Sequence, residues 1–229
     1  MERGESSFSS TFLFLSSLFV TCLLVSNVIA GKLITVFGVV LPSAVMLFPI
    51  TYILGDVFTE VYGFRKTRIV IWTGFAANAL MSLVFLAAIA LPYPGFWKGQ
   101  EAYATVLGTA PRIVAASLVA YFSGEFANSI VLSLLKKATK GRYLWTRTIS
   151  STVVGQGLDT ALFIAIGFAG QVPAAALLQL MIAQYLFKVG YEVVLTPVTY
   201  LVVGTIKRRE GIDAVDTDVS YNPFALGGK

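Results

Sequence analysis

Six ionisable residues lie inside stretches of this chain that are otherwise apolar, and their side chains have the chemistry to bind a polar ligand or a proton. They are Asp56, Glu60, Glu125, Asp159, Lys188 and Glu192. A charge at the centre of a bilayer costs about 2.5–3.5 kcal/mol on insertion scales. Six of them facing lipid would cost on the order of 15 kcal/mol, comparable with the stability of a whole domain. We therefore expect these side chains to face a polar interior, a water-filled cavity or an interface.

The spacing of the polar residues puts them on common helix faces. Side chains three or four residues apart lie on the same side of a helix. The predicted polar faces are Tyr52, Asp56 and Glu60; Tyr121, Glu125 and Asn128; Gln156, Asp159 and Phe163; and Gln184, Lys188 and Glu192. Asn27 and Asn78 add uncharged polar groups on two further segments. We expect these faces to converge on one shared space between helices.

The charge balance of this interior indicates a use beyond structure. Lys188 and Glu192 can pair within their helix, although lysine first is the weaker orientation. A buried ion pair seldom stabilises more than apolar packing does. Five carboxylates against one lysine need protons, solvation, a bound cation or hydrogen-bond donors. The alternatives are a structural network of charges, an interfacial position for Glu60 and asparagines that join helices.

The composition indicates a membrane protein and excludes several kinds of site. The chain is 56% hydrophobic and 13% charged, with a mean hydropathy of +0.78, whereas a soluble domain carries about 25% charged residues. Cys22 is the one cysteine and there is no histidine, which excludes a disulfide framework, zinc sites and histidine catalysis. The sequence also has no phosphate-binding loop for ATP hydrolysis. We predict no metal, no cofactor and no catalytic residues.

The apolar segments predict an all-α membrane protein with six transmembrane helices. Each segment reaches or exceeds the roughly 20 residues that cross a bilayer. They run from Phe8 to Ala30, Ser43 to Tyr62, Thr67 to Leu91, Arg112 to Leu135, Arg147 to Gly170, and Pro173 to Ile206. The last is long enough to be tilted, or kinked at Pro197. Residues 1–206 thus form one transmembrane domain, whose first segment we expect to be a retained anchor.

Basic residues predict the orientation of the bundle. Three connections hold most of them: Arg65, Lys66 and Arg68; Lys136, Lys137, Lys140, Arg142 and Arg147; and Lys207, Arg208 and Arg209. The positive-inside rule places these connections in the cytoplasm, with both termini. This sorting also argues against nucleic acid as the partner of a chain with net charge +5. Residues 207–229 are predicted to be a polar, mobile cytoplasmic tail, and the aromatic loop 92–111 an interfacial belt on the outer side.

Five fragments together resemble one family. They are "LLVSNVIAGKL", "FPITYILGDVFTEVYGFRKTR", "GTAPRIVAASLVAYFSGEFANS", "VGQGLDTALF" and "LFKVGYEVVLTPVTY". In this order they are similar to the queuosine precursor transporters of the bacterial inner membrane, also called the vitamin uptake transporter family. The resemblance runs from about Leu18 to Tyr200.

The resemblance implies a six-helix transporter, similar to the substrate-binding subunits of energy-coupling-factor importers, whose cargo is a cyano- or aminomethyl-substituted 7-deazaguanine. Carboxylates can accept hydrogen bonds from the ring N–H and amine of such a base, and amides can donate to its carbonyl. The expected substrate-binding residues are Asn27, Asp56, Glu60, Glu125, Asn128, Gln156, Asp159, Gln184, Lys188 and Glu192. Phe163 or Tyr191 could stack on the base.

Several alternatives stay open at the level of the sequence. A stand-alone carrier coupled to protons is favoured over a subunit that depends on a cytoplasmic ATPase. An intramembrane enzyme is a further alternative, but no nucleophile–base arrangement stands out. Besides lipid and the substrate, a second copy of the chain is a candidate partner, because small-residue helix faces are present.

Overall fold

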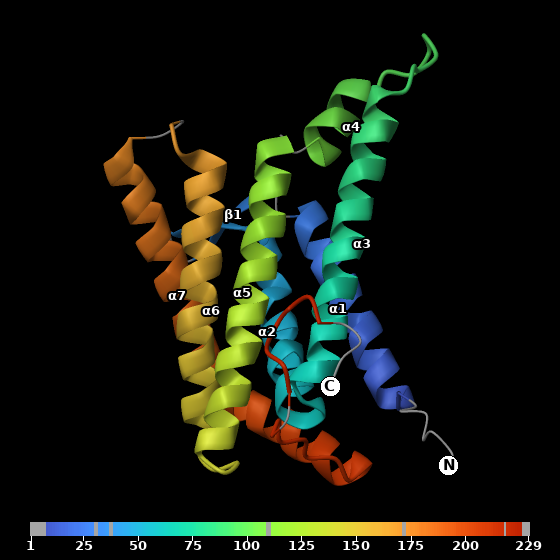
Figure 1. The fold of residues 1–229 in the computed structure, drawn as a ribbon. Coiled ribbons are helices and arrows are strands. Elements are labelled where there is room, and N and C mark those ends of the chain that lie inside the picture. The colour runs from blue at the N-terminus through green and yellow to red at the C-terminus, as the bar shows by residue number, and fades with distance from the viewer. Residues whose placement is uncertain are drawn as a thin grey trace.

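The structure is a computed structural model that describes residues 8–29, 32–36, 39–108, 111–170, 173–217 and 219–225. Long helices run alternately up and down the molecule (Figure 1). Among the described residues, five helices are long and apolar enough to cross a membrane. They belong to α1 (Ser10–Ile29), α3 (Phe64–Ala90), α5 (Pro111–Ala138), α6 (Leu144–Phe168) and α7 (Ala174–Glu210). These helices confirm five of the predicted spanning segments.

The segment predicted as the second span, 43–62, is divided into shorter pieces. Two strands, β1 (Leu33–Val36) and β2 (Val39–Pro42), form an antiparallel hairpin. The other regular elements of the described residues are helical. A 3-10 turn, η1 (Ser43–Met46), α2 (Phe48–Val57) and a π-helical turn, η2 (Phe58–Tyr62), follow. Helix α2 has 10 residues and is about 15 Å long at 1.5 Å per residue. Alone it is too short to cross a hydrocarbon core of about 30 Å.

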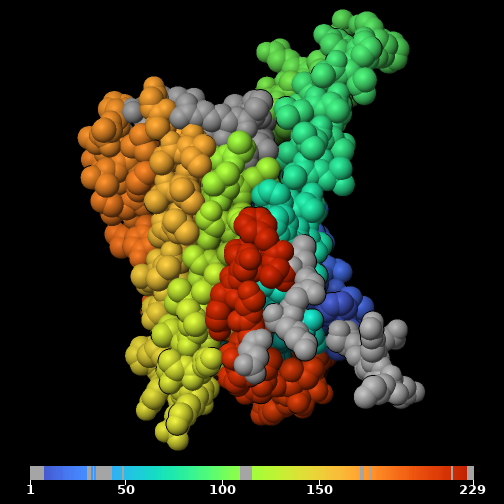
Figure 2. All heavy atoms as spheres, viewed as in Figure 1, coloured from blue at the N-terminus to red at the C-terminus, as the bar shows by residue number. Residues whose placement is uncertain are grey.

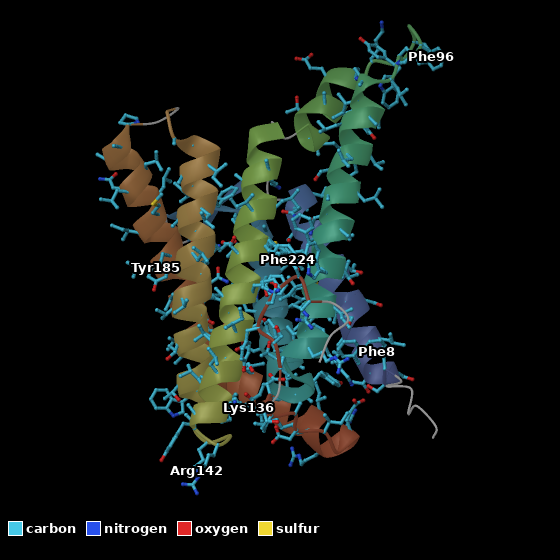
Figure 3. The ribbon with its side chains drawn as sticks, in the orientation of Figure 1. Phe8, Phe96, Lys136, Arg142, Tyr185 and Phe224 are labelled. Atoms are coloured by element: carbon cyan, nitrogen blue, oxygen red, sulfur yellow. The ribbon has the colours of Figure 1, made fainter. Side chains whose placement is uncertain are left out.

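The basic connections gather at one end of the bundle. The turn between α5 and α6, the start of α3 and the last turns of α7 all lie at the lower end in Figure 1. Figure 3 labels Lys136 and Arg142 there, and Phe96 at the opposite end, beside the short helix α4 (Gln100–Leu107). Phe96 is 84% exposed. The charge sorting expected from the sequence is therefore present in the fold.

Close backbone contact joins α5 to α6. A Cβ added to Gly124 would lie 2.7 Å from the Cβ of Asp159, and one added to Gly155 would lie 2.7 Å from the Cβ of Asn128. Such distances leave no room for a side chain, so the glycines let the two helix backbones approach. This contact fixes how the polar faces of α5 and α6 lie relative to each other.

Helix α7 continues to Glu210, beyond the predicted end, and includes Pro197. In Figure 1 its last turns run across the lower end of the bundle, beneath α2 and α3. The bend is attributable to Pro197, because a proline inside a helix removes a backbone hydrogen bond. Gly211, with φ at +65°, ends the helix in the left-handed conformation that glycine adopts readily.

The tail folds back onto the bundle, contrary to the mobile tail expected from the sequence. Figure 2 shows it lying on the surface alongside α5. Arg68 of α3 donates hydrogen bonds to the carbonyls of Ser220 and Asn222, at 3.2 and 2.8 Å. The indole N–H of Trp72 donates to the carbonyl of Pro223 at 2.8 Å. These contacts hold the described part of the tail against α3.

Candidate functional site

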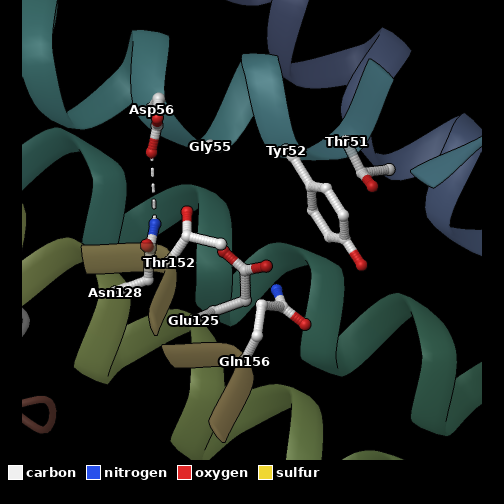
Figure 4. A pocket seen from close by; sticks show the side chains of 8 residues that line it. All are labelled: Thr51, Tyr52, Gly55, Asp56, Glu125, Asn128, Thr152 and Gln156. Carbon is white, nitrogen blue, oxygen red and sulfur yellow. Dashed lines mark hydrogen bonds between the residues drawn. The ribbon is translucent and has the colours of Figure 1, made fainter. Parts of the chain in front are cut away.

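A narrow polar cavity lies between α2, α5 and α6 (Figure 4). Its volume is about 10 Å³, roughly what one water molecule needs. Eight residues line it: Thr51, Tyr52, Gly55 and Asp56 of α2, Glu125 and Asn128 of α5, and Thr152 and Gln156 of α6. Four of these were predicted site residues: Asp56, Glu125, Asn128 and Gln156.

Helical spacing and small residues bring these side chains together. Tyr52 and Asp56 are one turn apart on α2, as are Glu125 and Asn128 on α5. The close contact of α5 and α6 places Gln156 beside the α5 pair. On the opposite wall, a Cβ at Gly55 would lie 3.5 Å from Oε2 of Glu125. The Glu125 carboxylate therefore lies against a part of α2 that carries no side chain.

Three oxygen atoms around the cavity are poised to accept hydrogen bonds. Asp56 Oδ1 accepts a long hydrogen bond from the amide of Asn128, at 3.4 Å. Asp56 Oδ2, Asn128 Oδ1 and Gln156 Oε1 are buried and have no hydrogen-bond partner among the residues that the structure describes. A buried polar atom left in this way costs about 1–3 kcal/mol. The arrangement suits a ligand that brings N–H donors.

Lys188 pairs with Asp159 on a neighbouring helix, and not with Glu192 on its own helix. Its Nζ lies 2.5 Å from Oδ2 of Asp159 on α6, and both side chains are partly buried. The pairing of Lys188 with Glu192 considered from the sequence is therefore replaced by an ion pair with Asp159 on the neighbouring helix. Asp159 lies one turn beyond Gln156 on α6, so the pair is next to the cavity without lining it.

Glu192 lies outside the cavity lining, yet it is 1% exposed. Within the described part of the chain, no donor reaches either of its carboxylate oxygens, and the neighbouring group with which it can share a hydrogen bond is the carboxyl group of Asp56. Glu192 lies close enough to Asp56 for their charges to interact. Helix α7, which carries Glu192, packs against α2, which carries Asp56. A carboxylate in this position needs a proton or a ligand to offset its burial.

Glu60 takes part in an ion-pair cluster at the lower end, away from the cavity. Its Oε1 lies 2.7 Å from Arg147, 2.8 Å from Lys207 and 3.6 Å from Lys136. The side chain is fully buried. The structure therefore gives Glu60 a role in joining η2 to α5, α6 and α7. Glu60 is near enough to Asp56 for their charges to interact, but it does not line the cavity.

The two remaining predicted residues also lie apart from the cavity. Asn27 of α1 donates a hydrogen bond to the side-chain oxygen of Asn78 on α3, which is the helix-joining alternative considered for asparagines. Gln184 is half-buried on α7 and does not line the cavity.

Sequence reasoning missed Thr51, Gly55 and Thr152 as lining residues, and it placed Tyr52 on the correct face without assigning it to the site. The i, i+4 spacing of Tyr52 from Asp56 was a usable signal. Thr51, Gly55 and Thr152 carry no comparable signal, because small residues are common throughout membrane helices.

Comparison with known proteins points to one family. Residues 42–202 match the family described as "putative vitamin uptake transporter". The chain is 27% identical over 186 residues to a Bacillus subtilis (strain 168) protein named "Probable queuosine precursor transporter", covering 81% of each chain. It is 27% identical over 173 residues to the Escherichia coli (strain K12) "Queuosine precursor transporter", covering 74% of this chain and 75% of that protein. No solved structure is significantly similar to this chain.

Proposed function

This chain belongs to the vitamin uptake transporter family, and we propose that it imports a queuosine precursor, a 7-cyano- or 7-aminomethyl-7-deazaguanine, across the bacterial inner membrane. The matched family covers more than half of the chain, and it is a family of transporters, not of enzymes. The long apolar helices make the protein a multi-pass membrane protein. The names of the two relatives supply the class of cargo.

The observation that carries the proposal is the set of oxygen acceptors around the cavity. A guanine-like edge presents a ring N–H and an exocyclic amine, and one carboxylate can accept both. Asp56, with Oδ2 buried and without a hydrogen-bond partner among the described residues, is the proposed acceptor. Glu125 would face an aminomethyl arm, which is cationic. The amides of Asn128 and Gln156 can turn to donate to the ring carbonyl.

Tyr52 is the aromatic residue that lines the cavity, and we assign it the role of stacking on the flat base. A cavity of about 10 Å³ is far smaller than a bicyclic base. Binding therefore requires the walls to separate, as alternating access at a midplane site does.

For the topology we propose six crossings with both termini in the cytoplasm. The hairpin, η1, α2 and η2 together form the crossing that α2 is too short to make alone. In Figure 1, α2 descends toward the lower end, where α3 begins. The basic connections at that end support its cytoplasmic placement.

Labelling of single cysteines tests this topology. In a Cys22→Ser background, Phe96→Cys and Arg142→Cys place exposed thiols at opposite ends. We expect a membrane-impermeant maleimide to label Phe96→Cys in intact cells and Arg142→Cys only after permeabilisation. Labelling of both in intact cells would contradict the proposed topology.

Uptake of a radiolabelled deazaguanine tests the function. Unlabelled cyano- and aminomethyl-deazaguanine should compete, whereas common vitamins should not. Loss of a charge-assisted hydrogen bond costs about 1.5–3 kcal/mol, so Asp56→Asn should reduce uptake by at least about tenfold. Glu101→Gln, which neutralises an exposed acid on α4, is the matched control. Normal uptake by Asp56→Asn, at equal protein level in the membrane, would discard the site.

We propose a stand-alone carrier over a subunit driven by a separate ATPase. Import that survives deletion of candidate ATPases and stops with a proton ionophore would support this choice. A second copy of the chain and bilayer lipid remain the proposed further partners.

A further inference from the structure

Glu192 and Asp56 form a pair of buried carboxylates to which no basic side chain among the described residues is ion-paired. Glu192 is 1% exposed and Asp56 is 2% exposed. Both oxygens of Glu192 and Oδ2 of Asp56 lack a hydrogen-bond donor among the residues that the structure describes, and the two carboxyl groups are close enough to hydrogen-bond to each other when one of them carries a proton. Asp56 lines the cavity from α2, and Glu192 of α7 lies near enough to Asp56 for the two carboxyl groups to interact. Asp56 thus belongs to the cavity wall, and Glu192 is a second carboxylate next to it that does not line the cavity.

The other titratable groups nearby are either acidic themselves or already ion-paired. On α7 itself, Lys188 donates to Asp159 of α6. From η2, Glu60 faces Asp56 but is held by Arg147, Lys207 and Lys136. Glu125 of α5 faces Asp56, and Tyr52 of α2 faces Glu192. Each of these groups is acidic or already ion-paired, so the surroundings do not offset a double negative charge on Glu192 and Asp56.

Two adjacent carboxylates in a dry interior do not both ionise readily, because their like charges repel and neither is well solvated. Carboxylate dyads in such positions share a proton. A metal ion is a weaker candidate, since within the described residues no group of three acidic, histidine or cysteine side chains could hold one.

We propose that Glu192 is the proton-coupling residue of this carrier, and that it exchanges protons through its pairing with Asp56. This inference rests on the proposed function. Substrate N–H donors bind ionised Asp56, and ionised Asp56 requires the proton of the pair to be on Glu192. Proton and substrate therefore favour each other's binding, as linkage requires. Loss of the proton from Glu192 to the cytoplasm restores repulsion within the pair and weakens the hold on the substrate, so one proton enters with each base.

Reconstituted vesicles separate coupling from substrate binding. The probe is radiolabelled 7-aminomethyl-7-deazaguanine, followed in two assays: exchange against unlabelled base without any gradient, and accumulation driven by an inward proton gradient. Gln mimics protonated Glu192, so Glu192→Gln should keep exchange within about twofold of wild type and lose gradient-driven accumulation. Glu101→Gln should keep both activities.

The outcomes are distinct. Loss of both activities by well-folded Glu192→Gln would overturn the inference and make Glu192 a substrate-binding or structural residue. Wild-type exchange without a response to the proton gradient, or with a response to sodium alone, would overturn it while leaving the proposed function intact. Absence of wild-type exchange would overturn the proposed function itself.

A second measurement does not depend on the variant folding. Addition of the base to lightly buffered vesicles containing wild-type protein should alkalinise the external medium as protons enter with the substrate. The alkalinisation should disappear when a proton ionophore is present. Substrate entry without any pH change would overturn the inference.

Discussion

Lys136 of α5 contacts both Glu60 and Asp213, and so connects the interior of the bundle to its tail. Its Nζ donates hydrogen bonds to the backbone carbonyl of Glu60 and to the carboxylate of Asp213, both at 2.5 Å. It also donates to the carbonyl of Ala214 at 2.6 Å. Lys136 is 2% exposed, whereas the Asp213 side chain is 57% exposed. The buried lysine therefore holds an exposed tail residue at the end of the bundle that carries the basic connections.

Neutralising Lys136 should destabilise the protein and release the tail. Removing one partner from a buried charge cluster costs about 3–5 kcal/mol. We expect the loss of stability in Lys136→Met to be near the smaller of these values, because Glu60 keeps its ion pairs with Arg147 and Lys207. The measurements are thermal unfolding in detergent and chymotrypsin cleavage at Tyr221. Lys137→Met is the control, since the exposed Lys137 side chain contacts the tail through one hydrogen bond to Thr217. Equal behaviour of the two variants would contradict the assignment.

Docking of the tail should weaken in acid. Burial acts to raise the pKa of Asp213, but hydrogen bonds and charges from Lys136 and Lys207 outweigh it and lower the pKa below its ordinary value. The stabilisation from Asp213 is therefore complete above the unfolded pKa of about 3.9 and is lost as the pH falls through the folded pKa.

Trp72 offers a fluorescent reporter for this acid transition, because it contacts Pro223 and Phe224 of the tail. With Trp97 and Trp145 changed to phenylalanine, Trp72 is the remaining tryptophan of the three. We expect its emission to change below about pH 4, and Asp213→Asn to remove the part of that change due to Asp213. An emission independent of pH would show that Asp213 does not hold the tail.

The glycine contact between α5 and α6 should tolerate no side chain. Gly155→Ala would place a Cβ 2.7 Å from that of Asn128. Overpacking of this kind costs about 1–3 kcal/mol. We expect lower thermal stability and reduced uptake, because the cavity walls on both helices would be displaced. Gly157→Ala is the matched control on the same helix, since its Cβ would meet Tyr185 at an ordinary 3.5 Å. A Gly155→Ala protein as stable as Gly157→Ala would refute the tight contact.

The Asp159–Lys188 pair should be stabilising only as a pair. Lys188→Met leaves Asp159 without its cation, which we expect to lower the protein level in the membrane. Asp159→Asn combined with Lys188→Met should restore the level, because no partly buried charge is left uncompensated. The measurement is immunoblotting of membranes together with a double-mutant cycle of thermal unfolding. Strictly additive effects would indicate that the two side chains act independently.

Features that depend on amino-acid composition and on helical periodicity could be predicted from the sequence. Long apolar runs located five spanning helices, and the spacing of Glu125 from Asn128 placed both at one cavity. The division of the segment 43–62 into η1, α2 and η2 was not predicted, because hydropathy does not register the breaks between these elements. The apolar residues of this segment are as compatible with one continuous spanning helix as with three shorter elements.

Pairings between helices were beyond sequence reasoning. Helical periodicity fixes which residues share a face, but not the rotation of each helix about its own axis. The partner of Lys188 was therefore sought on its own helix, whereas it is Asp159 on the next. Docking of the tail was missed for a related reason: its contacts through Ser220, Asn222 and Pro223 use backbone carbonyls, which every residue possesses.

The contact of Gly124 with α6 has a mechanical consequence. Because the two backbones are in such close contact, we expect α5 and α6 to move together as one wall of the cavity. The opposite wall is α2, a helix of 10 residues bounded by a 3-10 turn and a π-helical turn. If the cavity admits a molecule as large as a purine, as we propose, we expect this short segment to be the wall that is displaced, with η1 and η2 as its hinges.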